Sequence, residues 1–157
     1  MNRTLVTYFS ATGITKKIAE RLAGLIGADI HEIIPAESYS QADLNWHDPQ
    51  SRSSLETADE QARPAISGDI KDISTYDTIY IGFPIWWYRE PRIIDTFLET
   101  HDFTHKIIIP FVTSGASPIG QTVTYMQRFV PQAVVKAGKR FTADVTDEEL
   151  KNWAHNV

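Results

Sequence analysis

Apolar and β-branched residues cluster along the chain in five short runs, and each run predicts a β-strand. The runs cover residues 5–9, 29–34, 78–83, 107–112 and 134–141. The second run alternates polar and apolar positions, as a half-buried strand does, and the fifth run is the weakest. Between the runs, apolar residues recur at helical spacing around residues 18–26, 93–98, 123–130 and 147–153. Strands therefore alternate with helices along most of the chain.

This alternation predicts an α/β fold in three layers, with a doubly wound and mostly parallel sheet of five strands. A chain of 157 residues has room for one domain, which we expect to span residues 1–157. Residues 35–68 depart from the pattern, because they are polar and carry only scattered apolar residues. We expect this stretch to form an extended crossover with at most short helical pieces.

Charge and the lack of cysteine exclude several classes of function. A net charge of −5 and a pI near 5.5 disfavour a nucleic-acid or anionic-membrane surface. Without cysteine, the chain has no disulfide, no thiolate nucleophile and no cysteine-ligated metal. The five histidines show no metal-ligand spacing, so we expect no metal site. Because no apolar run approaches the ~20 residues that span a bilayer and no leader segment is evident, we expect a cytoplasmic protein.

The loop after the first predicted strand carries the most informative chemistry. It reads Ser10-Ala11-Thr12-Gly13-Ile14-Thr15 and leads directly into the first predicted helix. Unpaired backbone N–H groups and the positive end of the helix dipole favour an anion there, and the three hydroxyls can add donors. The alternative is that Ser10 or Thr12 only caps the helix while Gly13 eases the turn. Three hydroxyls within six residues favour a phosphate cradle.

Two further loops follow predicted strands. The first contains Pro84-Ile85-Trp86-Trp87-Tyr88, whose rings suit a planar heteroaromatic ligand, although some of them can equally belong to the core or to a subunit contact. The second contains Thr113-Ser114-Gly115-Ala116 and continues to Gly120. Its small and hydroxyl-bearing residues suit the polar edge of such a ring, although a simple turn explains them as well. Because parallel strands end at one edge of the sheet, we expect the three loops to form one site.

Several phosphate-binding and catalytic motifs are absent from the chain. It has neither the Gly-x-Gly-x-x-Gly dinucleotide fingerprint nor the Gly-x-x-x-x-Gly-Lys-Ser/Thr triphosphate loop. It lacks the thiolate of a cysteine phosphatase, the acidic strand end of a receiver domain and the Gly-x-Ser-x-Gly elbow of a hydrolase. The loop at Ser10–Thr15 is therefore best interpreted as a cradle for one phosphate monoester.

In these motifs the chain resembles the flavodoxin family. The first loop matches the family's Ser/Thr-x-Thr-Gly-x-Thr phosphate loop, and the loops at residues 83–87 and 113–115 follow in the expected order. The resemblance covers essentially the whole chain and includes the extended crossover of a variant subgroup of short flavodoxin-like proteins. It implies a flavodoxin-like fold with strand order 2-1-3-4-5 and a noncovalently bound flavin mononucleotide (FMN).

The resemblance also assigns roles to the three loops. The loop Ser10–Thr15 would bind the cofactor, with Ser10, Thr12, Gly13 and Thr15 holding the phosphate. Residues 84–88 would flank the isoalloxazine ring, and residues 113–116 would meet its pyrimidine edge. The loop at residues 114–120 departs from typical electron-carrier flavodoxins because it has no acidic or aromatic residue, while Arg89 and Arg92 lie close to the tryptophans. We therefore expect a less negative second reduction potential than in low-potential carriers.

The sequence leaves three functions open. The favoured one is an electron-transfer flavoprotein, whose partner is a redox protein or a small-molecule electron acceptor. The second is an NAD(P)H-dependent flavin reductase of quinones or other small molecules, in which Trp46 and the aromatic loop would form a substrate pocket. The third is a flavin-free interaction or anion-binding module. Whether the chain is itself an enzyme, and whether it is a monomer or a homodimer, stays open, and no catalytic residue is predicted.

Overall fold

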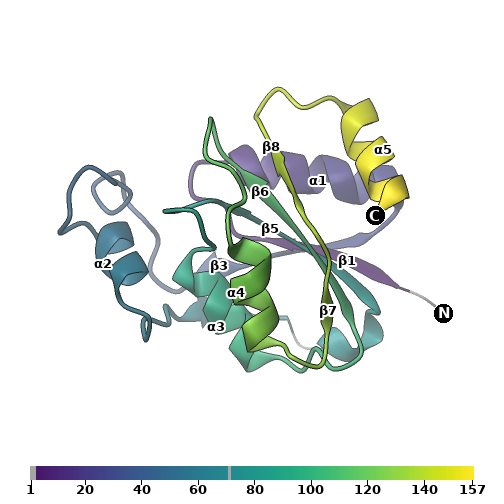
Figure 1. Ribbon diagram of the computed structural model, residues 1–157, viewed down its shortest axis with the longest axis horizontal. Coiled ribbons are helices and arrows are strands. Elements are labelled where there is room, and N and C mark those ends of the chain that lie inside the picture. The colour runs from purple at the N-terminus through teal and green to yellow at the C-terminus, as the bar shows by residue number, and fades with distance from the viewer. Residues whose placement is uncertain (1–2, 71) are drawn as a thin grey trace.

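The computed structural model describes residues 3–70 and 72–157 and consists of a parallel sheet between two layers of helices (Figure 1). In spatial order the sheet contains β2 (Asp29–Glu32), β1 (Thr4–Tyr8), β5 (Thr78–Pro84), β6 (Ile107–Thr113), and an edge shared by β7 (Val134–Val135) and β8 (Lys139–Phe141). All of these pairings are parallel. The predicted α/β class and the order 2-1-3-4-5 are therefore confirmed.

Two helices cover each face of the sheet (Figure 1). One pair is α1 (Ile14–Ile26) and α5 (Asp147–Asn156), and the other is α3 (Arg92–Thr100) and α4 (Thr122–Phe129). Alternate residues of each central strand point to opposite helix layers, because side chains along a strand alternate between its faces. The first core contains Val6, Ile18, Leu22, Phe111 and Leu150, and the second contains Ile79, Ile81, Ile93, Phe97 and Met126. Within the described residues, no helix is both long and apolar enough to cross a membrane.

The prediction of one continuous last strand at residues 134–141 is wrong. The structure splits it into β7 and β8, which pair with different parts of β6. On the side of β6 that faces β7, Ile108 O accepts a hydrogen bond from Lys136 N at 2.8 Å. Pro110 follows two residues later in β6 and has no N–H to donate. Gly138 lies against this break, where a Cβ would come within 2.1 Å of Pro110 O. The proline and the close backbone approach explain the interruption.

The predicted strand at residues 29–34 is also divided. Its first part is β2, and Ile33 extends the pairing with one hydrogen bond from its N–H to Tyr8 O at 2.7 Å. The chain then leaves the sheet, and β3 (Ile34–Pro35) pairs antiparallel with β4 (Ile66–Ser67). The proline in β3 ends the main-sheet pairing because it carries no N–H donor.

The crossover between β3 and β4 is long and mostly irregular, as predicted, and its short helical piece is α2 (Arg52–Ala58). Figure 1 shows α2 and its flanking loops set apart from the sheet, beside the ends of α3 and α4. Arg52 holds this segment together: its guanidinium lies 3.7 Å from the centre of the Tyr39 ring and donates to Glu56 at 2.8 Å and to Glu37 O at 2.7 Å. A further short 3-10 helix, Ile73–Thr75, precedes β5.

The centre of the sheet gives a first testable prediction. A Cβ on Gly82 would come within 2.2 Å of the Phe111 ring, so we expect Gly82→Ala to lower the free energy of unfolding by about 1–3 kcal/mol. Gly24 in α1 is the matched control, because no described atom lies within 4 Å of its added Cβ and alanine favours a helix. Urea denaturation measures both variants. Equal effects of the two substitutions would contradict the packing argument.

Candidate functional site

The three loops predicted from the sequence lie at the same edge of the sheet, at the carboxyl ends of β1, β5 and β6. The parallel register of these strands places them there: Tyr8 pairs with Gly82, and Pro84 pairs with Thr113. In a doubly wound sheet this edge is the usual place for a ligand.

The first loop leaves the amino end of α1 open. Gly13 is the residue that precedes the helix and has a φ of 96°, a left-handed conformation that favours glycine. The hydroxyl of Ser10 accepts a hydrogen bond from Gly13 N at 3.0 Å, which shapes the loop. In the described part of the chain, no side chain caps the first turn of α1. Ser10 therefore caps only the N–H of Gly13, and among the described residues the N–H groups of Ile14, Thr15 and Lys16 have no side-chain acceptor.

A buried hydrogen bond joins the first loop to the third. The hydroxyls of Thr15 and Thr113 lie 2.7 Å apart, and both residues are almost fully buried. This bond fixes the first turn of α1 against the carboxyl end of β6. Thr12, in contrast, is exposed at the tip of the loop.

The second loop forms a tight turn with two aromatic residues at its centre. Backbone hydrogen bonds run in both directions between Trp86 and Arg89, at 3.1 and 3.2 Å. Trp87 and Tyr88 between them have φ values of 49° and 64°, a left-handed conformation that costs a residue with a side chain about 1–3 kcal/mol. Glycine or asparagine usually occupies such positions, so the two rings occur here in spite of the backbone cost.

The three rings of the second loop have different surroundings. Trp86 packs edge-on against Phe9 and Tyr39, with ring centres 5.7 and 5.5 Å apart, and so belongs to the core beneath the loop. Trp87 and Tyr88 keep 42% and 59% of their surface exposed. Trp87 and Tyr88 are therefore the most exposed of the three rings, whereas Trp86 is partly buried against the core.

A cavity of about 360 Å³ opens beside these rings. Its walls come from the aromatic turn, the third loop and the crossover, and its lining comprises Leu44, Trp46, Ser53, Ile85, Trp86, Trp87, Tyr88 and Ser117. The crossover thus supplies one wall of the cavity. The sequence indicated Trp46 as a pocket residue and the loop that contains Ser117 as part of the site, but it gave no indication of Leu44 or Ser53, because only the folded crossover brings them here.

The third loop is held in shape by Arg140 from β8. The Arg140 guanidinium donates to Ser114 Oγ at 2.7 Å and to Gly115 O at 2.7 Å. Ser114 donates in turn to Ser117 O at 2.5 Å. Gly120 at the end of the loop lies against the second loop, where a Cβ would be 2.6 Å from Tyr88 O. Gly115 and the adjacent Ala116 are exposed at the tip, so their backbone groups are accessible.

A buried pair of acids lies directly behind the aromatic turn. Glu90 and Asp95 are both fully buried, and each has one carboxyl oxygen without a partner among the described residues. The nearest charged groups are Arg89, 3.5 Å from Glu90 and 3.7 Å from Asp95, and Arg92, 3.2 Å from Asp95. Burial, followed by a hydrogen bond and the charge of Asp95, raises the pKa of Glu90 well above the usual range of a glutamate. The raised pKa favours the protonated form of Glu90 near neutral pH.

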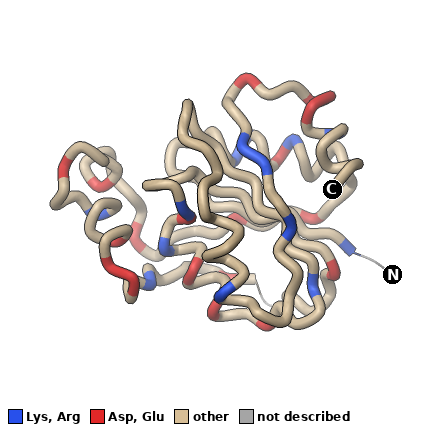
Figure 2. Tube along the Cα trace, in the orientation of Figure 1, with Lys and Arg blue, Asp and Glu red and all other residues tan. Residues whose placement is uncertain are grey.

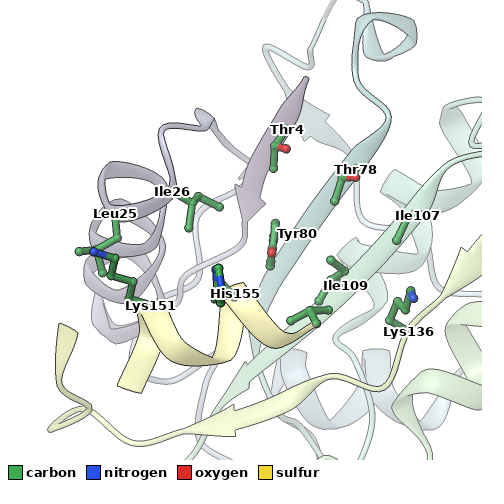
Figure 3. Close-up of a pocket in the computed structure, with 12 residues that line it drawn as sticks. Thr4, Leu25, Ile26, Thr78, Tyr80, Ile107, Ile109, Lys136, Lys151 and His155 are labelled. Atoms are coloured by element: carbon green, nitrogen blue, oxygen red, sulfur yellow. The ribbon is translucent and has the colours of Figure 1, made fainter. Parts of the chain in front are cut away.

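A second cavity, of about 480 Å³, lies away from the three loops at the amino ends of the strands (Figure 3). Figure 3 shows Lys151 and His155 of α5 on one side and Tyr80 on the floor of the sheet. Elsewhere, His101 lies 3.1 Å from Asp69, and His31 lies 4.0 Å from it. No group of three or more histidines and acids suited to a metal ion occurs within residues 3–70 and 72–157.

The sheet, its helix layers and the convergent loops define an α/β protein of the doubly wound class with a cavity at the carboxyl edge of the sheet. A family model described as Flavodoxin matches residues 3–157, and the chain therefore belongs to the flavodoxin family. No curated protein matches the chain.

Solved structures agree with this fold. The chain is 44% identical to a protein from Bacteroides uniformis assigned as a flavoprotein, with a TM-score of 0.93 and 98% of each chain covered. A protein from Bacteroides eggerthii, also assigned as a flavoprotein, is 41% identical, with a TM-score of 0.93 over 100% of this chain and 98% of that chain. A flavoprotein in complex with FMN from Lactobacillus acidophilus NCFM is 24% identical, with a TM-score of 0.76 over 98% and 99% of the two chains.

The buried acids predict an alkaline loss of stability. Because folding raises the pKa of Glu90, its contribution to stability is complete below the ordinary glutamate pKa and is lost as the pH rises through the raised value. We expect the free energy of unfolding to fall between about pH 4.5 and pH 9, and Glu90→Gln, which keeps the hydrogen bond but cannot ionise, to flatten this dependence. Urea denaturation at each pH is the measurement.

The exposed Glu148 of α5 provides the control for this experiment. Glu148→Gln should keep the pH dependence of the original chain. A dependence that survives in Glu90→Gln would show that another group is responsible.

Proposed function

We propose that the protein is an FMN-binding electron-transfer flavoprotein. The observation that carries the proposal is the uncapped amino end of α1 beside an aromatic-lined cavity at one edge of the sheet. Membership of the flavodoxin family and the FMN complex of the Lactobacillus acidophilus protein support the same cofactor.

The first loop suits the phosphate of FMN. The outward-facing N–H groups of α1 and the exposed hydroxyl of Thr12 can donate to phosphate oxygens, and the helix dipole favours their negative charge. Gly13 adds to the fit, because its left-handed backbone turns the loop and its position has open space where a Cβ would be. Thr15 would contribute its backbone N–H rather than a free hydroxyl, since its hydroxyl is bonded to Thr113.

The second and third loops suit the flavin ring. Trp87 and Tyr88 present exposed rings to the cavity, and aromatic contacts of this kind stabilise a planar heteroaromatic ligand. The backbone groups of Thr113–Ala116, fixed by Arg140, would meet the polar edge of the ring. Leu44 and Trp46 of the crossover would exclude water from the remaining side.

FMN supplies one- and two-electron transfer when bound, while the chain provides binding, orientation and electrostatic tuning. Arg89 and Arg92, which follow the aromatic turn, interact with Glu90 and Asp95, so part of their charge is offset. The expectation of a less negative second reduction potential therefore rests mainly on the absence of acids from the third loop. A redox titration of the FMN-bound protein measures that potential.

The alternative is an NAD(P)H-dependent reductase of a small molecule, and the cavity beside Trp46 and Trp87 is the feature that favours it. Steady-state oxidation of NADH or NADPH, with and without a quinone, distinguishes the two functions. A carrier should show negligible turnover unless a reductase is added, whereas sustained turnover by the chain alone would establish the reductase. A protein that stays colourless after mixing with FMN would refute both.

The phosphate loop gives a direct mutational prediction. Thr12→Val should weaken FMN binding by about 1–3 kcal/mol. The substitution removes the hydroxyl that would donate to the charged phosphate of FMN, while the shape of the side chain is kept. Fluorescence titration of FMN measures the affinity. Thr124→Val, at an exposed position of α4, is the control and should leave the affinity unchanged. Unchanged affinity in Thr12→Val would refute the role of this hydroxyl.

A further inference from the structure

Arginine side chains converge on a small pocket between the crossover and the layer of α3 and α4. The pocket has a volume of about 250 Å³ and is lined by Arg63, Arg89, Arg92, Arg128, Glu60, Gln61, Tyr125 and Phe129. Figure 2 shows basic positions, interspersed with acidic ones, where α2 approaches α3 and α4. The chain as a whole has a net charge of −5, so this concentration of cations is a local feature.

Two of the four arginines have structural partners. Arg92 is buried, lies 3.2 Å from Asp95 and donates to Glu56 O and Thr57 O, at 3.2 and 2.9 Å. Arg63 donates to Glu99 at 2.7 Å. These bonds join the crossover to α3 and leave little of either charge for a ligand.

The other two arginines, Arg89 and Arg128, lie near the same aromatic ring. Their guanidinium groups are 4.2 and 5.7 Å from the centre of the Tyr125 ring. Within the described ranges, Arg128 has no ion pair, and the buried Nε of Arg89 has no hydrogen-bond acceptor. Among the described residues, Arg89 makes one long hydrogen bond to Glu90, at 3.5 Å, and lies 3.7 Å from Asp95, so both contacts are weak.

The charges around this pair of arginines favour an anion. Two guanidinium groups near one ring repel each other unless negative charge lies between them. Glu90 does not fully supply this negative charge, because its burial against Asp95 favours the protonated, neutral form of its carboxyl group. Glu60 lines the pocket but is exposed and forms no ion pair with the arginines of the described ranges, so a bound anion would meet some repulsion from its carboxylate.

We propose that this pocket binds a phosphate group, free or esterified, between Arg89 and Arg128. A phosphate carries about −1.5 to −2 charges at neutral pH, which complements Arg128 and the part of the Arg89 charge that Glu90 and Asp95 do not offset. Its oxygens suit the paired N–H donors of the two guanidinium groups, which lie 4.2 and 5.7 Å from the centre of the Tyr125 ring. The pocket contains no residue of the loop at Ser10–Thr15, so it is a second anion site.

The proposal does not rest on flavin binding, although the two sites are neighbours. Arg89 closes the turn whose centre is Trp87 and Tyr88, through backbone bonds with Trp86 of 3.1 and 3.2 Å. A phosphate bound to the Arg89 side chain would therefore lie next to the cavity lined by those rings. Because the two sites are adjacent, a phosphate bound at Arg89, either free or as part of a reactant, would lie beside the proposed redox site.

The test is a titration with phosphate, followed by NMR of arginine Nε–H signals in the FMN-saturated protein. We expect saturable shifts of the Arg89 Nε–H signal, while the backbone signals of Gly13 and Thr15 report the other phosphate site separately. Inorganic phosphate and phenyl phosphate form two arms of the experiment. Tighter binding of the first identifies free phosphate as the ligand, and tighter binding of the second identifies an ester. Absence of saturable Arg89 shifts in both arms overturns the proposal, whatever the Gly13 and Thr15 signals report about the other phosphate site.

Charge variants make the test specific. Arg128→Gln should weaken phosphate binding about tenfold, because it removes a charge-assisted contact. Glu60→Gln should strengthen binding, since it removes the nearby exposed carboxylate. Lys151→Gln changes the net charge by the same amount on α5, on the other face of the sheet, and should have no effect. Equal weakening by Arg128→Gln and Lys151→Gln would show nonspecific attraction and overturn the proposal.

Discussion

The hydrogen bond between the Thr15 and Thr113 hydroxyls, 2.7 Å long and buried, connects the two ends of the candidate site. The parallel register of β1, β5 and β6 brings the three loops to one edge, but register alone does not fix how they face one another. The threonine pair sets the amino end of α1 against the carboxyl end of β6. The contact between Gly120 and Tyr88 then sets the third loop against the second. Phosphate loop, aromatic turn and polar loop therefore form one rigid arrangement.

Much of this arrangement was predictable because local patterns and global topology agree. Buried parallel strands appear as short apolar runs, and the alternation with helices predicts both the class of fold and the edge at which the loops meet. Two strand predictions were wrong for a reason present in the sequence: Pro35 and Pro110 lack the N–H that a continuous ladder needs. A proline interrupts strand pairing only where its nitrogen faces a neighbouring strand. Which way the nitrogen faces is known only once the strands are paired.

The parts of the site that sequence could not predict all come from contacts distant in the chain. Leu44 and Ser53 reach the cavity only because Arg52 and Arg92 fix the crossover. Arg140 supports the third loop from a strand 26 residues away. The aromatic motif predicted rings near a ligand, but it could not distinguish Trp86, which packs in the core, from Trp87 and Tyr88, which do not. That difference results from the turn and its left-handed backbone.

Charge is organised differently on the two sides of the aromatic turn. At the phosphate loop, backbone N–H groups and the dipole of α1 provide the positive potential, so no cation is needed. Behind the turn, arginines and buried acids lie in close contact, and the protonation of one acid decides how much positive charge remains. The two proposed anion sites therefore obtain their positive potential from different groups.

The central claim is that the loop Ser10–Thr15 anchors FMN by its phosphate, and comparison of FMN with riboflavin tests it most directly. Riboflavin has the same ring but no phosphate, so the ring contacts are equal in the two ligands. Titration of the protein with each ligand should give riboflavin an affinity at least about a hundredfold lower than that of FMN. Equal affinities would show that the loop does not bind the phosphate and would contradict the account.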